Sequence, residues 1–187
     1  MQDADLFMEL AGIAGVFVGF GALISVRSGG ASGNVEVGML RGMVSFGSLT
    51  IVAALAPVTL ARFDITEHGV WALSSAVILI GNVVMLAAMT RTPEYRANRG
   101  AGYGGSRWLA VLDLLSVALW ILATFLGPIV IALGVAPDLE AGLYFAAVVV
   151  LLFQAALLLL TLVYTQQGSA RASDRVEPPS AGRAAIA

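Results

Sequence analysis

Five long apolar segments, separated by short polar stretches, restrict what this chain can fold into more than any other feature. Their approximate bounds are 6–26, 39–61, 70–89, 108–133 and 141–164. A helix needs roughly 20 mostly apolar residues to cross a hydrocarbon core about 30 Å thick, and each segment has that length. The sequence therefore predicts an all-α polytopic membrane protein, with one domain over residues 1–166 made of five transmembrane helices.

The composition agrees with a membrane protein. Hydrophobic residues make up 59% of the 187 residues and charged residues only 12%, whereas soluble domains have roughly 45–50% apolar and about 25% charged residues. All ten basic residues are arginine in a chain rich in Ala, Gly and Val, which suggests a bacterial source with GC-rich DNA. We therefore expect a multi-pass protein of a bacterial cytoplasmic (inner) membrane. A net charge of −2 argues against nucleic acid as a partner.

The arginines predict the orientation of the bundle, because positive residues collect in short cytoplasmic loops. Nine of the ten fall in or beside the first loop, the third loop and the C-terminal tail, and only Arg62 falls on the other side. Such a pattern requires an odd number of spans. We expect the N-terminus outside and the C-terminus in the cytoplasm.

The two ends of the chain carry separate expectations. The first segment follows the acidic residues MQDAD instead of the positive start of a signal peptide, so we expect it to be retained as a helix. Residues 167–187 are small, polar and contain proline, and they are too poor in large apolar groups to build a core. They predict a disordered cytoplasmic tail.

Two prolines predict helix kinks inside the second and fourth segments. Pro57 and Pro128 each lack the backbone N–H that would bond to the carbonyl four residues earlier. The carbonyls of Ala53 and Thr124 therefore lose their donors. In membranes such freed groups are satisfied by neighbouring helices, hydroxyls or water.

Charged and polar residues inside the spans are the candidates for an intramembrane site. Arg41 and Asp113 have a similar depth in the second and fourth segments, so we predict an ion pair between them. At helical spacing both faces continue outward as hydroxyls, and segments three and five add amides. The predicted polar face consists of Ser45, Ser48, Ser116, Thr124, Asn82 and Gln154.

This polar face has two interpretations. Buried amides and hydroxyls in membranes usually hold helices together, at around 0.6 kcal/mol each. The ion pair would then clamp the bundle. In the other interpretation the face lines a polar pathway that the ion pair gates.

A second polar group is expected at the outer ends of the first three helices, where Glu9, Arg62 and His68 could meet. A lone histidine beside carboxylates can sense pH or help to bind a metal. However, these residues lack a metal-ligand spacing, and a solvated loop histidine is the simpler interpretation. We predict no metal and no cofactor.

The first segment, ELAGIAGVFVGFGALISV, gathers its small residues on one side at helical spacing. Gly12, Gly15 and Gly19 lie on this side, and the last two form a G-x-x-x-G pair. Because apolar burial does not drive helix association in lipid, close backbone approach over glycine gives such a helix its packing energy. The glycines predict a packing face, either for helices of the same chain, which is our expectation, or for another copy.

No catalytic motif accompanies these features. The chain has no H-E-x-x-H, P-loop or G-x-S-x-G motif and no cysteine, so we predict a protein that is not an enzyme. Two classes of function remain. One is a structural or accessory bundle that self-associates or serves a larger membrane complex, and the other is a small oligomeric channel or transporter. The expected partners are the lipid bilayer and other membrane subunits, either copies of this chain or different proteins.

The stretches LRGMVSFGSLTIVAALAPVTL, VWALSSAVILIGN and ELAGIAGVFVGFGAL resemble a group of small, uncharacterised bacterial multi-pass membrane proteins. The likeness covers about the first half of the chain. It implies a bacterial inner-membrane protein and brings no reaction, ligand or site with it.

Overall fold

The computed structural model describes residues 4–27, 34–91 and 107–176, and these residues are helical apart from short connections. The helices are α1 (Ala4–Arg27), α2 (Asn34–Leu60), α3 (Glu67–Arg91), α5 (Arg107–Ile121), α6 (Gly127–Ala132) and α7 (Glu140–Val176). A π-helical turn, η1 (Leu122–Leu126), joins α5 to α6 in one span, and a short 3-10 helix, η2 (Pro137–Leu139), precedes α7.

Five helical stretches in these residues are each long and apolar enough to cross a membrane. Their bounds are Ala4–Ile24, Val37–Leu60, Glu67–Arg91, Leu114–Ala132 and Pro137–Tyr164. Each lies within a few residues of a segment expected from hydropathy, except that the fourth begins six residues later than position 108. The prediction of an all-helical bundle with five membrane-length helices, as in a multi-pass membrane protein, is confirmed.

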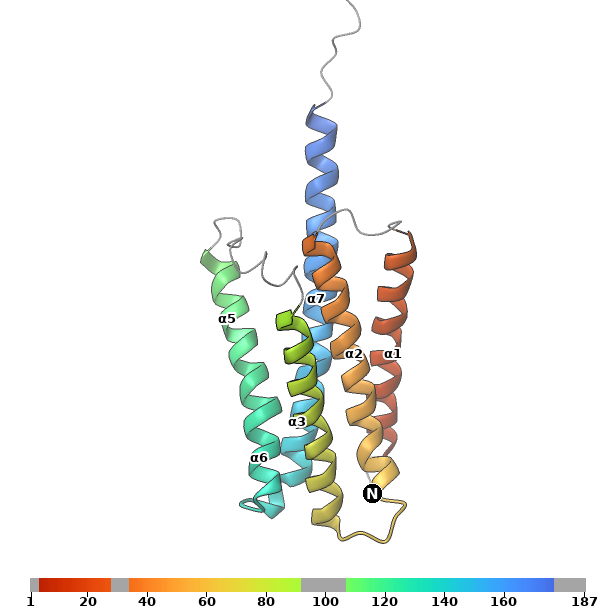
Figure 1. Cartoon of the computed structure of the whole chain (residues 1–187), viewed down its shortest axis with the longest axis vertical. Helices are drawn as coiled ribbons and strands as arrows, with labels where there is room; N and C mark the ends of the chain where they lie inside the picture. Colours follow the sequence, from red (N-terminus) through yellow and green to blue (C-terminus); the bar gives the residue numbers. More distant parts are fainter. Residues whose placement is uncertain (1–3, 28–33, 92–106, 177–187) are drawn as a thin grey trace, which may run out of the picture.

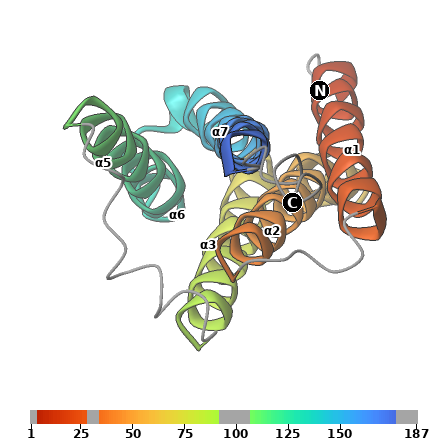
Figure 2. The ribbon, with the colours of Figure 1, turned by 90° about the horizontal axis from the view of Figure 1, so that it is seen from above.

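The helices stand side by side and alternate in direction (Figure 1). The start of α1, the α2–α3 connection and the α6–α7 connection lie at the lower end in Figure 1, and α7 projects beyond the upper end. Seen from above, α7 has α5 and α6 on one side and α1 on the other (Figure 2). Because α7 contacts every other helix, it is the central element of the bundle.

α7 is longer than the sequence predicted. It runs to Val176, so the expectation of disorder from residue 167 is corrected for residues 167–176. The physical reason is that the stretch TQQGSARASDRV contains good helix formers such as Gln, Ala and Arg. A helix that is already nucleated extends through such residues at little cost. Residues 177–187 lie outside the described part of the chain.

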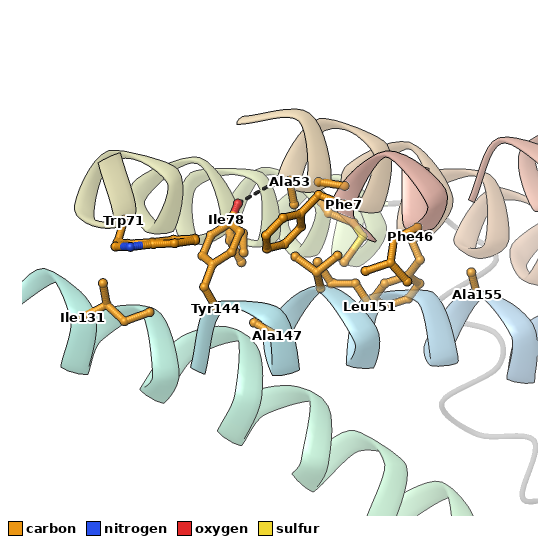
Figure 3. Close-up of a cluster of buried hydrophobic side chains, with 14 residues drawn as sticks. Phe7, Phe46, Ala53, Trp71, Ile78, Ile131, Tyr144, Ala147, Leu151 and Ala155 are labelled. Carbon is orange, nitrogen blue, oxygen red and sulfur yellow. Dashed lines mark hydrogen bonds between the residues drawn. The ribbon is translucent and has the colours of Figure 1, made fainter. Parts of the chain in front are cut away.

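Aromatic side chains from several helices meet in the buried core (Figure 3). The ring of Phe7 on α1 lies 6.3 Å from that of Trp71 on α3 and 6.0 Å from that of Tyr144 on α7, measured between centroids. Trp71 and Tyr144 are 5.6 Å apart. Small residues of α7, such as Ala147 and Ala155, are fully buried beside them. The core therefore ties α1 and α3 to α7.

Candidate functional site

One layer of polar side chains joins α5 to its two neighbours. Asn82 on α3 is fully buried, donates from Nδ2 to the Ile78 carbonyl at 2.9 Å, and accepts at Oδ1 from Trp120 Nε1 of α5 at 3.0 Å. Gln154 on α7 donates from Nε2 to the Ser116 carbonyl of α5 at 2.7 Å. These amide groups are engaged in holding helices together.

A second layer surrounds the first predicted kink. The hydroxyl of Tyr144 on α7 donates to the Ala53 carbonyl of α2 at 2.6 Å (Figure 3). This is the carbonyl that Pro57 leaves without a helical donor. α2 continues as one α-helix through Pro57, so the freed group is satisfied by a neighbouring helix, as such groups in membranes require.

The other proline is accommodated differently. Gly127, just before Pro128, donates its N–H to the Leu122 carbonyl, five residues earlier, so the helix widens into the π-turn η1. The Thr124 side chain is fully buried, and its hydroxyl donates to the Trp120 carbonyl at 2.8 Å. The sequence predicted a kink at this point, and the structure has a change of helix type.

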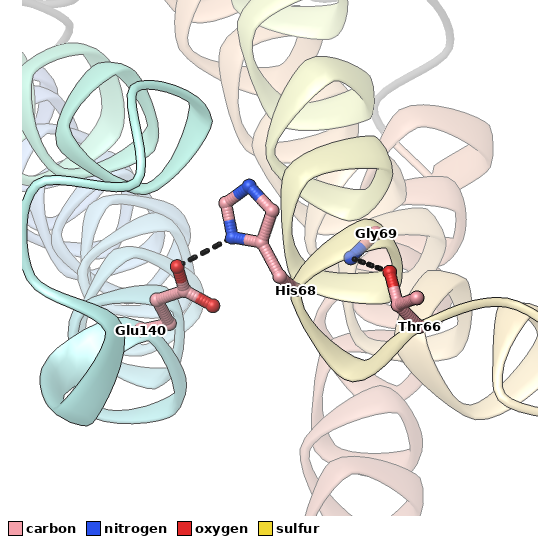
Figure 4. A network of polar contacts seen from close by, with 4 residues as sticks. All are labelled: Thr66, His68, Gly69 and Glu140. Atoms are coloured by element: carbon pink, nitrogen blue, oxygen red, sulfur yellow. Dashed lines mark hydrogen bonds and ion pairs between the residues drawn. The ribbon is translucent and has the colours of Figure 1, made fainter.

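An acid and the single histidine join two helix starts at the lower end of Figure 1. His68 near the start of α3 places its Nδ1 2.6 Å from Oε1 of Glu140, the first residue of α7 (Figure 4). The Glu140 side chain is only 5% exposed, whereas that of His68 is 50% exposed. Because an ionised carboxylate can only accept, Nδ1 carries the hydrogen in this contact. Gly134, at φ +63°, lies against the same imidazole ring.

The outer cluster predicted from sequence is therefore corrected. His68 pairs with Glu140 at the start of α7, not with Glu9 or Arg62. Among the described residues, Glu9 and Arg62 are both exposed and no ion pair joins them to each other or to His68. At the start of α1 it is Phe7 that packs against Trp71 and Tyr144, whereas Glu9, two residues later, is exposed.

The predicted Arg41–Asp113 pair lies partly outside the described side chains. Arg41 on α2 is exposed, and the side chain of Asp113 is not among those described. Both views show the start of α5 apart from α2 (Figures 1 and 2). The ion pair stays a prediction.

Only part of the predicted polar face comes together. Asn82, Thr124 and Gln154 are buried where α3, α5, η1 and α7 meet, and the Ser116 carbonyl joins them. Ser48, in contrast, is exposed, and Ser45 is half-buried. The face on α2 does not continue as the row of buried hydroxyls that its spacing suggested.

The glycine face of α1 also differs from our expectation. Gly12, Gly15 and Gly19 are exposed, and an added Cβ at any of them would meet nothing within 4 Å. The expectation that this face packs against helices of the same chain is therefore wrong for the described helices. α1 and α2 approach closely at Gly47, where a Cβ would lie 2.7 Å from Val18 Cγ2, and at Gly21, where a Cβ would lie 3.1 Å from Val44 Cγ2. Apolar side chains on the opposite side of α1, such as Phe7, form its buried face.

Sequence reasoning missed Tyr144 and Glu140 as site residues. A tyrosine near the start of a strongly aliphatic helix indicates only that its hydroxyl bonds to some group, because a buried Tyr O–H usually finds a partner. An acid in the first turn of a helix is commonly explained by the helix dipole alone. Neither signal names the partner, which lies 91 residues away for Tyr144 and 72 residues away for Glu140.

In the described part of the chain, no three His, Asp or Glu side chains are grouped as a metal site would require. No protein-family model, curated protein or solved structure matches the chain.

Proposed function

We propose that this chain is a non-enzymatic integral protein of a bacterial inner membrane. Its role is that of a structural or accessory bundle, which self-associates or serves a larger membrane complex. One observation carries this proposal: the amides and the phenol inside the spans already bond to groups of neighbouring helices. Those side chains are Asn82, Gln154 and Tyr144.

A pathway for ions or solutes needs polar atoms that face water and exchange partners. Here the Asn82 oxygen and the Tyr144 hydrogen are engaged within the bundle. Bonds of this kind contribute about 0.6 kcal/mol on average and up to about 1.7 kcal/mol in membranes. That is a contribution to packing, and it supports a bundle with a fixed interior.

The alternative is a small oligomeric channel or transporter. The observation in its favour is that Ser74 and Ser75 on α3 are fully buried and their hydroxyls have no hydrogen-bond partner. Such hydroxyls could line a polar route if several copies of the chain surrounded it. The first proposal is preferred because three interhelical bonds span the same interior.

The orientation we propose has the start of α1 outside and the end of α7 in the cytoplasm. The start of α1, the α2–α3 connection and the Glu140 end of α7 lie at one end of the bundle, and the ends of α1 and α3 lie at the other. Arg27 and Arg91 close α1 and α3 at that second end. The rule that positive residues stay in the cytoplasm then sets the direction.

Cysteine scanning tests whether the interior is wet. The chain has no cysteine, so single cysteines at Ser116 and Thr124 can be probed in native membranes with a charged, water-soluble thiol reagent. Ala61→Cys, exposed after α2, is the reactive control. We expect slow reaction at position 124 and fast reaction at position 61, with both reacting fully after denaturation. Equal rates at positions 124 and 61 would favour the channel.

A mass measurement tests the accessory role itself. The chain is purified in mild detergent, and the complex is weighed by native mass spectrometry. A closed homo-oligomer or a defined complex with another membrane protein is the expected result. A chain that stays monomeric at all concentrations and is captured without companions would contradict the proposal.

A further inference from the structure

Ser75 on α3, like its neighbour Ser74, differs from the threonines of this bundle. Its side chain is fully buried and its Oγ has no hydrogen-bond partner. The threonines on the spans behave differently, because each donates to the carbonyl of a preceding turn. At Thr50, Thr124 and Thr161 this bond is 2.8 Å long. A buried hydroxyl without a partner is costly, so its surroundings should contain a partner of another kind.

Two backbone carbonyls of the π-turn lack the donors that an α-helix would supply. The Gly127 N–H, which would reach the Ala123 carbonyl in an α-helix, bonds to Leu122 instead. Pro128 has no N–H for the Thr124 carbonyl. Ala123 and Thr124 therefore both lose their α-helical donors. Such groups in a span need water, a hydroxyl or a neighbouring helix.

The Asn82–Trp120 hydrogen bond places Ser75 and the π-turn at the same depth in the bundle. α3 and the α5–α6 span run in opposite directions (Figure 1). Ser75 is seven residues before Asn82, so it lies on the same side of α3, about two turns toward the α2–α3 connection. Gly127 is seven residues after Trp120 and lies the same distance along its own span. Helical carbonyls point toward the C-terminus, so those of Ala123 and Thr124 approach this level.

We propose that Ser75 and the π-turn form a buried site for one water molecule, which lies between the Ser75 hydroxyl and the carbonyls of Ala123 and Thr124. The donors and acceptors of these groups match those of one water molecule. The Ser75 O–H donates to the water, and the water donates its two hydrogens to the two carbonyls. Buried waters typically make about three hydrogen bonds. The water thereby stabilises the change of helix type that Pro128 causes.

Ser74, the neighbouring residue, does not share this site. It is 100° further around α3, and its hydroxyl is close to that of Tyr144. The site therefore depends on Ser75 alone for its side-chain contact. This makes a single substitution informative.

A double-mutant cycle between Ser75 and Pro128 tests the site. In the wild-type background, Ser75→Ala removes the donor to the water, and we expect the melting temperature in detergent to fall by about 2–4 °C. Pro128→Ala restores an N–H to the Thr124 carbonyl and allows the π-turn to close. In that background Ser75→Ala should change the melting temperature little. Ser48→Ala, at an exposed serine on α2, is the matched control and should have no effect.

Two results of the cycle would overturn the proposal. If the site is dry, Ser75→Ala removes an unsatisfied hydroxyl, and the melting temperature stays the same or rises. If Ser75→Ala lowers the melting temperature equally in both backgrounds, Ser75 does not act through the π-turn.

Two measurements on the wild-type chain keep the proposal testable if a variant fails to fold. A crystallographic or cryo-EM map that resolves ordered water should show one density peak bonded to Ser75 Oγ and both carbonyls. Ser75 Oγ bonded to the Trp71 carbonyl, with no peak, would overturn the site. Melting temperatures should also be equal in sodium, potassium and choline chloride at matched ionic strength. A rise specific to sodium would assign the site to a cation instead.

Discussion

The hydroxyl of Tyr144 on α7 donates a 2.6 Å hydrogen bond to the carbonyl oxygen of Ala53 on α2. Both residues are fully buried. Pro57 removes the helical donor of that same carbonyl, so a proline that would leave a costly unpaired group becomes the place where two helices are joined. The central position of α7 makes this possible, because its first turns pass beside α2.

Tyr144→Phe removes this bond and leaves the Ala53 carbonyl unpaired in the core. We expect the free energy of unfolding to fall by about 1–2 kcal/mol, measured by denaturant titration in mixed micelles. In a Pro57→Ala background the new N–H bonds to Ala53, and the same substitution should cost much less. An equal cost in both backgrounds would mean that Tyr144 acts through packing alone.

The Asn82–Trp120 hydrogen bond should be measurable as a coupling energy. Asn82→Leu and Trp120→Phe each remove one partner, and the double variant removes both. We expect a coupling of about 0.6–1.7 kcal/mol in the free energy of unfolding. Thr90→Ala, on an exposed position of the same helix, is a suitable control. Strict additivity of the two substitutions would contradict the bond.

Substitution by alanine should have opposite effects on stability at two glycines that both lie among apolar residues of a helix. Gly47→Ala puts a methyl group 2.7 Å from Val18 Cγ2, and overpacking of this kind costs about 1–3 kcal/mol. Gly15→Ala meets nothing within 4 Å and should gain up to about 1 kcal/mol from helix propensity. Thermal unfolding of the purified variants tests both. Destabilisation by Gly15→Ala would indicate that another helix covers that face.

His68→Ala should destabilise the lower end of the bundle in Figure 1. It leaves the Glu140 carboxylate, only 5% exposed, without its partner at 2.6 Å. Because His68 is itself half exposed, we expect a modest loss of about 1 kcal/mol in the free energy of unfolding. Glu67→Ala, at the exposed neighbouring residue, is the control. Adding Glu140→Gln to His68→Ala should recover part of the loss, and no recovery would contradict the pair.

The features that the sequence predicted correctly depend on local properties. Apolar length identifies the five spans, and the chemistry of proline identifies the carbonyl of Ala53 as a group in need of a donor. The amides Asn82 and Gln154 were expected to join helices, and both do so. None of these statements requires knowledge of which helix lies next to which.

The choice of partners was decided by the tertiary structure. Tyr144 reaches a carbonyl 91 residues away, and Glu140 takes the histidine that we had grouped with Glu9 and Arg62. The inward side of α1 was likewise decided by the tertiary structure, with Phe7 buried and Gly12, Gly15 and Gly19 exposed. In a helix that is apolar all round, periodicity does not indicate the buried side. Which side of a helix is buried, and which residues bond between helices, depends on which helices lie next to each other and at what relative height.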